Sequence, residues 1–329
     1  MVTMKDVARR AGVSVTTVSH VINETRFVSE ELRARVYQAM RELNYRPNAI
    51  ARSLRRKRTH TIGMIVPDIS YPFLAEVARG VEDRGFELGY NVILCDSDGD
   101  LKREGDYIEL LLERKVDGIV FVAAGESSGH VQALIEQGVP VVVCDRELPG
   151  VEVDTVIADN VESGRLATEH LIGLGHRRIG CIAGPEGLCI SDKRLEGYRQ
   201  ALEEQGLPFR EELVVHANFR CLGGYEAMRT LLSLDQPPTA IFACNDLMAV
   251  GAICAASQRR LRIPQDVAIV GCDDIALAPF TNPSLSTVAQ PKREMGAMAV
   301  EMLVERIQEE DKPPAKRVLP VELVIRDSC

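Results

Sequence analysis

Polar side chains follow several apolar runs of this sequence, at the point where each run ends. If the runs are parallel strands, these ends lie at the edge of the sheet where open α/β sheets bind ligands. Carboxylates there could accept hydrogen bonds and a guanidinium could donate them. The ordinary alternative is that each residue caps the next helix. The strand ends concerned carry Pro67-Asp68, Asp145-Arg146, Asn245-Asp246 and Asp273-Asp274.

A second set of residues, near the N-terminus, could contact DNA. Helices predicted over 4–11 and 15–22 are joined by Gly12-Val13-Ser14, an arrangement typical of a helix-turn-helix rather than an ordinary helical hairpin. The second helix of that motif enters the major groove. Its side chains suited to base edges are Val15, Thr16 and His20. Those better suited to phosphates are Ser14, Thr17, Ser19, Asn23 and Arg26.

The charge distribution favours a polyanionic partner for this end of the chain. The 329 residues carry a net charge of −9. Residues 1–60 contain 13 Lys and Arg against 5 Asp and Glu, whereas the remaining residues contain 26 against 43. A small basic segment joined to a large acidic one indicates that a nucleic acid would bind the basic segment alone.

Several other function classes lack their sequence signatures. The chain has no G-x-G-x-x-G or P-loop, no H-E-x-x-H and no C-x-x-C, so neither an enzyme nor a metal site is expected. Its nine cysteines are expected to be reduced thiols. No apolar run reaches the ~18–20 residues of a membrane helix, and the N-terminus does not resemble a signal peptide. We therefore expect a cytoplasmic protein that makes no membrane contact.

The elements that must position these residues change character near residue 60. Short helices precede it, and a third is predicted from Ser29 to about Leu43. Beyond Thr61, apolar runs alternate with helical stretches, and the alternation restarts near Ile179. This pattern predicts an α/β body of two doubly wound lobes with parallel sheets covered on both faces.

Separated motifs along the chain carry a family resemblance. They are KDVARRAGVS (5–14), TVSHVIN (17–23), RFVS (26–29), LNYRPN (43–48), ARSL (51–54), NDLMAVG (245–251) and VGCDD (270–274). Together they resemble the lactose/galactose-repressor family of transcriptional regulators. The resemblance implies a lambda-repressor-like helix-turn-helix head and a two-lobed body similar to periplasmic sugar-binding proteins.

The resemblance also implies domain boundaries and a hinge. Residues 48–56 would form a hinge helix in the minor groove at the centre of a palindromic operator. Leu54 would wedge between bases there, with Ala51 and Arg55 beside it. The implied divisions are a head (1–46), a hinge and linker (47–60), a first lobe that also dimerises (61–160 with 291–319) and a second lobe (161–290 with 320–329).

The same resemblance places a small-molecule effector between the lobes. Aromatic faces would cover a sugar ring, while carboxylates and guanidiniums would bind its hydroxyls. We therefore favour ribose, without any further cofactor; another pentose or hexose, a purine or a phosphorylated ligand stays open. Since buried unpaired charges are costly, we expect the empty cleft to stay open and wet. The residues implied to line the cleft are Phe73, Asp145, Arg146, Arg194, Phe219, Asn245, Asp273 and Gln290.

These features together predict a homodimeric repressor of a sugar-utilisation operon that leaves its operator when the sugar binds. The sign of the effector response stays open, because a purine-type relative uses its ligand to tighten DNA binding. A purine- or sugar-phosphate-responsive repressor of the same family and a global catabolite regulator stay open as alternatives. A transport-binding protein is disfavoured, since it would need a signal peptide and has no use for residues 1–60. A regulator of this kind is expected in the cytoplasm, associated with the nucleoid.

Overall fold

The computed structural model describes residues 2–23, 26–45, 58–123, 125, 128–309 and 311–329. The chain divides into two compact units, Met1–Thr59 and His60–Cys329, which we call the head and the body. The hinge helix predicted over 48–56, with Ala51, Leu54 and Arg55, lies outside the described residues.

The head is built from three helices, α1 (Met4–Ala11), α2 (Val15–Asn23) and α3 (Glu30–Glu42). At the start of α1, the Asp6 carboxylate accepts hydrogen bonds from the backbone N–H and the hydroxyl of Thr3, at 2.9 and 2.7 Å. Gly12 ends the helix at φ 66°, a conformation that favours glycine. The Arg35 guanidinium of α3 donates to the Ala11 carbonyl at 2.7 Å. The predicted helix-turn-helix is confirmed, around a small core of Val7, Ala8, Ala11, Val18, Val21, Val36 and Ala39.

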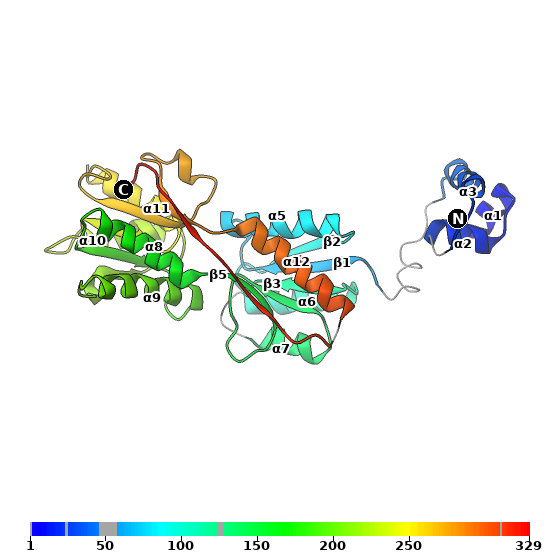
Figure 1. The fold of residues 1–329 in the computed structure, drawn as a ribbon, viewed down its shortest axis with the longest axis horizontal. Coiled ribbons are helices and arrows are strands. Elements are labelled where there is room, and N and C mark those ends of the chain that lie inside the picture. The colour runs from blue at the N-terminus through cyan, green and yellow to red at the C-terminus, as the bar shows by residue number, and fades with distance from the viewer. Residues whose placement is uncertain (1, 24–25, 46–57, 124, 126–127, 310) are drawn as a thin grey trace. The chain divides into compact units, whose positions relative to one another are not determined.

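The first lobe of the body is a six-stranded parallel sheet with helices on both faces (Figure 1). In the order β11-β5-β4-β3-β1-β2, its strands are Lys316–Leu319, Asp154–Ala158, Val141–Cys144, Gly118–Phe121, Thr61–Val66 and Asn91–Asp96. One face packs against α5 (Pro72–Glu87) and α12 (Lys292–Gln308). The other packs against α6 (Leu101–Glu113) and α7 (Gly129–Glu136).

The second lobe repeats this arrangement around a second six-stranded sheet. In the order β12-β10-β9-β8-β6-β7, its strands are Glu322–Val324, Ser286–Ala289, Ala268–Asp273, Ala240–Ala243, Ile179–Ala183 and Val214–His216. Only β12 runs antiparallel to its neighbour. The helices are α8 (Asn160–Gly173), α9 (Cys189–Glu204), α10 (Cys221–Leu231) and α11 (Asp246–Gln258), with short 3-10 turns at Glu211–Leu213 and Ala278–Phe280. The predicted fold class, with doubly wound parallel sheets, is confirmed.

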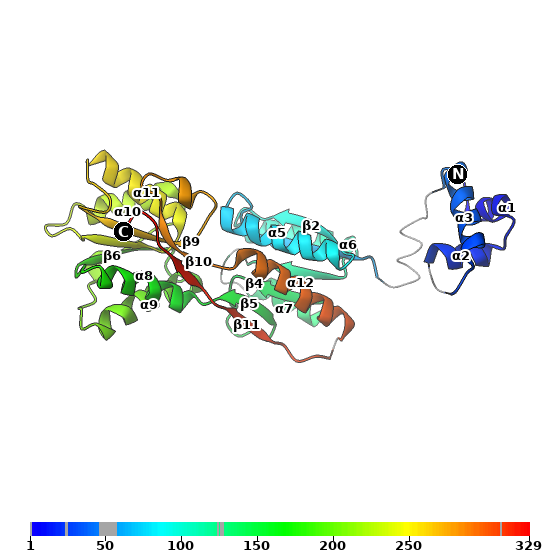
Figure 2. The same ribbon diagram turned by 45° about the horizontal axis from the view of Figure 1, so that its top comes forward.

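Three connections join the two sheets. The chain passes from β5 of the first sheet to α8, from β10 of the second sheet to α12, and from β11 of the first sheet to β12 of the second. Figure 2 shows the last of these as a strand that runs on from β11 into the second lobe. Two of these crossings leave the carboxyl ends of β5 and β10, so the carboxyl ends of the parallel strands of each sheet face the other lobe.

Three pairs of helices pack with their backbones in close contact: α5 with α12, α8 with α9, and α10 with α11. Each helix of a pair presents a glycine at the contact. A Cβ atom at any of these glycines would lie 1.9–2.2 Å from a carbonyl oxygen of the partner helix. No side chain fits at such a distance. The six positions are Gly80, Gly296, Gly164, Gly197, Gly224 and Gly251.

Among the described residues, no helix combines the length and the apolar character that a membrane span would need. All nine cysteines lie in the described part of the chain and are free thiols, of which Cys221 and Cys254 are exposed and the others are at least half-buried.

Two glycines of α8 offer a matched test of this packing. A Cβ at Gly164 would lie 2.0 Å from the Arg194 carbonyl oxygen, whereas a Cβ at Gly173 would meet nothing within 4 Å. We expect Gly164→Ala to lower the free energy of unfolding by about 1–3 kcal/mol because α9 must move, and Gly173→Ala to change it by less than about 1 kcal/mol. Urea unfolding followed by circular dichroism measures both, and equal stabilities would contradict the packing.

Candidate ligand-binding cleft and nucleic-acid interface

A buried polar cluster lies at the carboxyl edge of the second sheet. Its members, Arg194, Asn245, Asp273 and Gln290, are at most 4% exposed. One oxygen of the Asp273 carboxylate accepts a hydrogen bond from the Gln290 amide at 2.7 Å and lies 3.3 Å from the Arg194 guanidinium. Since α9, α11, β9 and the end of β10 supply these groups, the fold brings together four residues that are far apart in the sequence.

Arg194 is held in this cluster by acceptors on three sides. Its Nε donates to the Asn160 side chain at 2.8 Å, and Nη1 donates to the Cys244 carbonyl and contacts Asp273. A buried guanidinium is tolerated only when such acceptors surround it. The orientation of Arg194 is therefore set by the protein itself.

The Asp273 carboxyl is strongly affected by its surroundings. Burial raises its pKa to about 6, although the charges of Arg194 and Lys292 and the Tyr71 hydroxyl act in the opposite direction. Its second oxygen accepts a hydrogen bond from the Tyr71 hydroxyl at 2.5 Å. Tyr71 lies at the start of α5, so this hydrogen bond joins the two lobes.

Asn245 has two functions in the structure. Its side-chain oxygen accepts from the backbone N–H of Met248 at 2.8 Å and caps α11. Its amide nitrogen donates to the Tyr71 hydroxyl and to the Phe219 carbonyl, both at 3.0 Å. The capping role that was the ordinary alternative is thus present, and the same side chain also contributes to the polar cluster.

The first lobe supplies Asp145 and Arg146, which follow β4. Burial raises the pKa of the Asp145 carboxyl. The Arg146 guanidinium donates to the Ala123 carbonyl at 2.6 Å and lies 3.9 Å from the Asp145 carboxylate. Their arrangement joins the ends of β3 and β4, and it keeps both charges at the border of the cleft.

Two aromatic rings come from opposite lobes. Phe73 of α5 is buried, and its ring centroid lies 6.0 Å from that of Tyr71. Phe219 precedes α10, and its ring covers Gly184, where a Cβ would lie 2.2 Å from the ring. Because glycine has no side chain, position 184 leaves room for the Phe219 ring.

Strained backbone occurs at or just beyond the carboxyl ends of strands in both lobes. Asp145, Phe219, Asp273 and Asp274 have φ values of 70°, 60°, 117° and 52°. Each such conformation costs a residue other than glycine about 1–3 kcal/mol, and strain of this kind clusters at functional sites. Three of the four positions are among the predicted cleft residues.

The expectation of an open, wet cleft is wrong for the charged residues at its centre. Asp145, Arg194 and Asp273 are all at most 5% exposed, and protein groups pair them. The sequence gives no sign that the Tyr71 hydroxyl would take part in this pairing.

Among the residues that the structure describes, the side-chain oxygen of Gln290 and the hydroxyl of Ser191 are buried without a hydrogen-bond partner. Ser191 lies in the first turn of α9, one turn before Arg194. Sequence reasoning missed Ser191 and Tyr71. For Ser191 a signal exists, because its spacing to Arg194 puts both residues on one face of α9. For Tyr71 the sequence offers no such signal.

In the head, the structure places the predicted DNA contacts on or beside α2. Ser14, Val15 and Thr16 are exposed, while Thr17, Ser19 and His20 are half-buried. Ser14 caps the helix, since its hydroxyl accepts from the backbone N–H of Thr17 at 3.0 Å. The Asn23 amide donates to the Ser19 carbonyl at 2.7 Å, and Arg26 beyond the helix is exposed.

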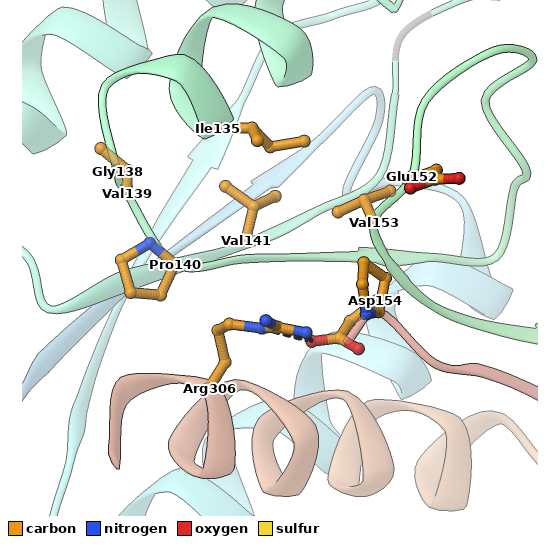
Figure 3. Close-up of a pocket in the computed structure, with 10 residues that line it drawn as sticks. Ile135, Gly138, Val139, Pro140, Val141, Glu152, Val153, Asp154 and Arg306 are labelled. Carbon is orange, nitrogen blue, oxygen red and sulfur yellow. Dashed lines mark hydrogen bonds and ion pairs between the residues drawn. The ribbon is translucent and has the colours of Figure 1, made fainter. Parts of the chain in front are cut away.

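Figure 3 shows a separate pocket in the first lobe, at the opposite ends of the strands from Asp145. Val139, Pro140 and Val141 line it, together with Asp154 and Arg306. The Arg306 Nε donates to the Asp154 carboxylate at 2.8 Å, so these two charges already pair with each other. Among the described residues, no group of three or more His, Cys, Asp or Glu side chains could hold a metal ion.

Comparison with known proteins identifies the class. Residues 3–48 match the bacterial regulatory proteins of the lacI family, and residues 168–329 match a periplasmic binding protein-like domain. The ribose operon repressor of Escherichia coli K12 is 45% identical over 309 residues, which cover 93% of this chain and 93% of that protein. The transcriptional repressor PurR of Aliivibrio fischeri MJ11 is 40% identical over 332 residues, covering 100% and 98%.

Solved structures agree with this assignment. The lac repressor dimer bound to operator and the anti-inducer ONPF has a TM-score of 0.89 at 28% identity, covering 99% of this chain and 98% of that one. A regulator from Enterococcus faecium with bound ribose has a TM-score of 0.74 at 33% identity, covering 82% and 98%. The protein is a bacterial regulator with a DNA-binding head, and not an enzyme. It belongs to the lacI family.

The raised pKa of Asp273 predicts a pH-dependent stability. Because the folded pKa of about 6 lies above the ordinary value of 3.8, the folded state favours the neutral carboxyl. Its contribution to stability is full below about pH 4 and is lost as the pH rises through about 6. Urea unfolding between pH 4 and 7 should show a flatter pH profile for Asp273→Asn than for the parent protein; identical profiles would contradict the assignment.

Proposed function

We propose that this protein is a homodimeric transcriptional repressor that releases a palindromic operator when ribose binds between the lobes of its body. The observation that carries the proposal is the buried cluster of Arg194, Asn245, Asp273 and Gln290, in a chain 45% identical to a ribose operon repressor. The ribose bound to the Enterococcus faecium regulator supports the same class of effector. Ribose is the only small molecule that this mechanism needs.

The chemistry of the cleft suits a compact polyhydroxylated ligand. Hydroxyls both donate and accept hydrogen bonds, so they can pair with the carboxylates of Asp145 and Asp273 and with the donors of Arg146 and Asn245. The unpartnered side-chain oxygen of Gln290 adds an acceptor. The rings of Phe73 and Phe219, on opposite lobes, would cover the apolar face of a sugar.

In the head, the exposed start of α2 would read the major groove. We infer that Val15, Thr16 and His20 contact bases and that Ser14, Thr17, Ser19, Asn23 and Arg26 position the helix on the phosphates. Ala51, Leu54 and Arg55 belong to the proposed hinge, where Leu54 would enter the minor groove and bend the operator.

A dimer would place two heads on two half-sites about one helical turn apart. The lac repressor solved on its operator is a dimer. Phe86 of α5 and Leu94 of the edge strand β2 are exposed apolar side chains on neighbouring elements of the first lobe, which suits a subunit contact there. We propose that effector binding moves the first lobes of such a dimer and separates the paired hinges. Acting on DNA, the protein would reside in the cytoplasm, associated with the nucleoid.

A purine-responsive repressor is the second candidate. The PurR relative aligns with the whole chain, and the arginines of the cleft could hold a charged ligand. In that case, the effector would strengthen operator binding. A gel-shift titration with ribose and with a purine base distinguishes the two functions by the ligand that acts and by the direction of its effect.

Removing the Asp273 side chain should abolish the response to ribose at concentrations that induce the parent protein, while leaving repression intact. Asp273→Ala deletes an acceptor for a hydroxyl, and we expect ribose affinity to fall by about 10–100-fold. Asp274→Ala is the matched control, because the Asp274 carboxylate pairs with Arg326 at 2.7 Å outside the cluster. Isothermal titration with ribose measures both. If millimolar ribose gives no heat with the parent protein and another metabolite does, ribose is not the effector.

Shortening Leu54 should affect DNA alone. We expect Leu54→Ala to weaken binding to a palindromic operator, because a methyl group cannot hold the central bases apart. Ribose binding should be unchanged, and this serves as the control for folding. Gel shifts in the absence of ribose provide the measurement. Parallel loss of both activities would indicate misfolding, and unchanged operator affinity would remove Leu54 from the interface.

A further inference from the structure

Tyr71 crosses the cleft from the first lobe to the second. It ends the loop between β1 and α5, and its half-buried phenol donates to the Asp273 carboxylate at 2.5 Å. The same hydroxyl accepts a hydrogen bond from the Asn245 amide at 3.0 Å. One hydroxyl of the first lobe therefore uses both of its hydrogen-bonding capacities on groups of the second.

The loop that carries Tyr71 is tied to the second lobe at another point. Arg220, just before α10, forms an ion pair with the Asp68 carboxylate and lies 3.5 Å from the Ser70 hydroxyl. Within the loop, the Asp68 carboxylate also accepts from the backbone N–H and the hydroxyl of Ser70, at 2.8 and 2.6 Å. These contacts hold the loop in the position that brings Tyr71 to Asp273.

The phenol takes the place that a ligand hydroxyl would need. One oxygen of Asp273 already faces Gln290 and Arg194, so the oxygen bonded to Tyr71 is the one left for a donor outside the cluster. A sugar hydroxyl and a phenol hydroxyl offer the same donor and acceptor. Both cannot bond to the same carboxylate oxygen and the same amide in the same geometry.

We propose that Tyr71 sets the effector affinity of the cleft by competing with an effector hydroxyl for Asp273 and Asn245. This inference rests on the proposed function, since it requires an effector that binds between the lobes. An effector must displace the phenol before it reaches the cluster. The apparent dissociation constant is then larger than the intrinsic one, in inverse proportion to the fraction of molecules in which Tyr71 has moved away.

Tyr71→Phe isolates the hydroxyl, because it keeps the ring that packs near Phe73. If the phenol is hydrogen-bonded to Asp273 and Asn245 in about nine molecules out of ten, the variant should bind ribose about tenfold more tightly. Tyr225→Phe is the matched control: it also removes one phenol hydrogen bond, to Gln258 at 2.7 Å, but on the surface of α10 and α11.

The first measurement needs no effector. Hydrogen–deuterium exchange of the full-length proteins should show several-fold faster exchange in Tyr71→Phe than in the parent, in the segments around residues 68–72 and 273–275. Tyr225→Phe should match the parent in both segments. Equal exchange in Tyr71→Phe and the parent would show that the Tyr71 hydroxyl does not hold the two lobes together, whatever the effector is.

The second measurement is a calorimetric titration of the same proteins with ribose. Tighter binding by Tyr71→Phe, or binding by this variant alone, supports the competition. Unchanged affinity overturns it. Weaker binding also overturns it, because Tyr71 would then be a direct effector contact. If neither protein binds ribose, the ribose assignment of the proposed function fails, and the exchange measurement alone decides whether Tyr71 bridges the lobes.

Discussion

Arg194 carries a buried positive charge, and several elements of the second lobe supply the acceptors that this charge requires. Asn160 at the start of α8, the carbonyl at the end of β8 and the carboxylate at the end of β9 all converge on the guanidinium. Each acceptor comes from a different element, so these elements must all be positioned correctly relative to Arg194. The cost of an unpaired buried charge, several kcal/mol, makes this cluster a strong constraint on the fold.

The close packing of α8 against α9 serves the same constraint. Gly164 of α8 allows the backbone of α9 to approach at Arg194 itself, so the spacing of these two helices decides where the guanidinium can reach. The strained turns at Asp145, Phe219 and Asp273 act at the other side of the cluster. They turn the chain at or just beyond the strand ends. Packing energy in the two lobes thus offsets strain at their common border.

Besides the three chain connections, polar pairs link the lobes. Tyr71 with Asp273, Arg220 with Asp68, and Lys193 of α9 with Glu147 beyond β4 at 2.5 Å all cross the border. Each exchanges readily for water or for a polar ligand, unlike an apolar interface of the same size. Lobes joined in this way can change their relative position when a small molecule supplies or removes a few hydrogen bonds. This property suits a regulator whose DNA-binding head must respond to a metabolite.

Local pattern in the sequence was enough to determine the alternation of strands and helices, the helix-turn-helix and the basic head, because periodicity, caps and charge are properties of neighbouring residues. The strand ends at Asp145, Asn245 and Asp273 could also be located, since parallel strands bring their carboxyl ends to one edge. The sequence pattern did not single out α12, β10, β11 or β12, whose places depend on crossings between lobes. The role of Tyr71 could not be foreseen either. It pairs with residues more than 170 positions away, and only the meeting of two lobes determines which hydroxyl reaches a buried carboxylate.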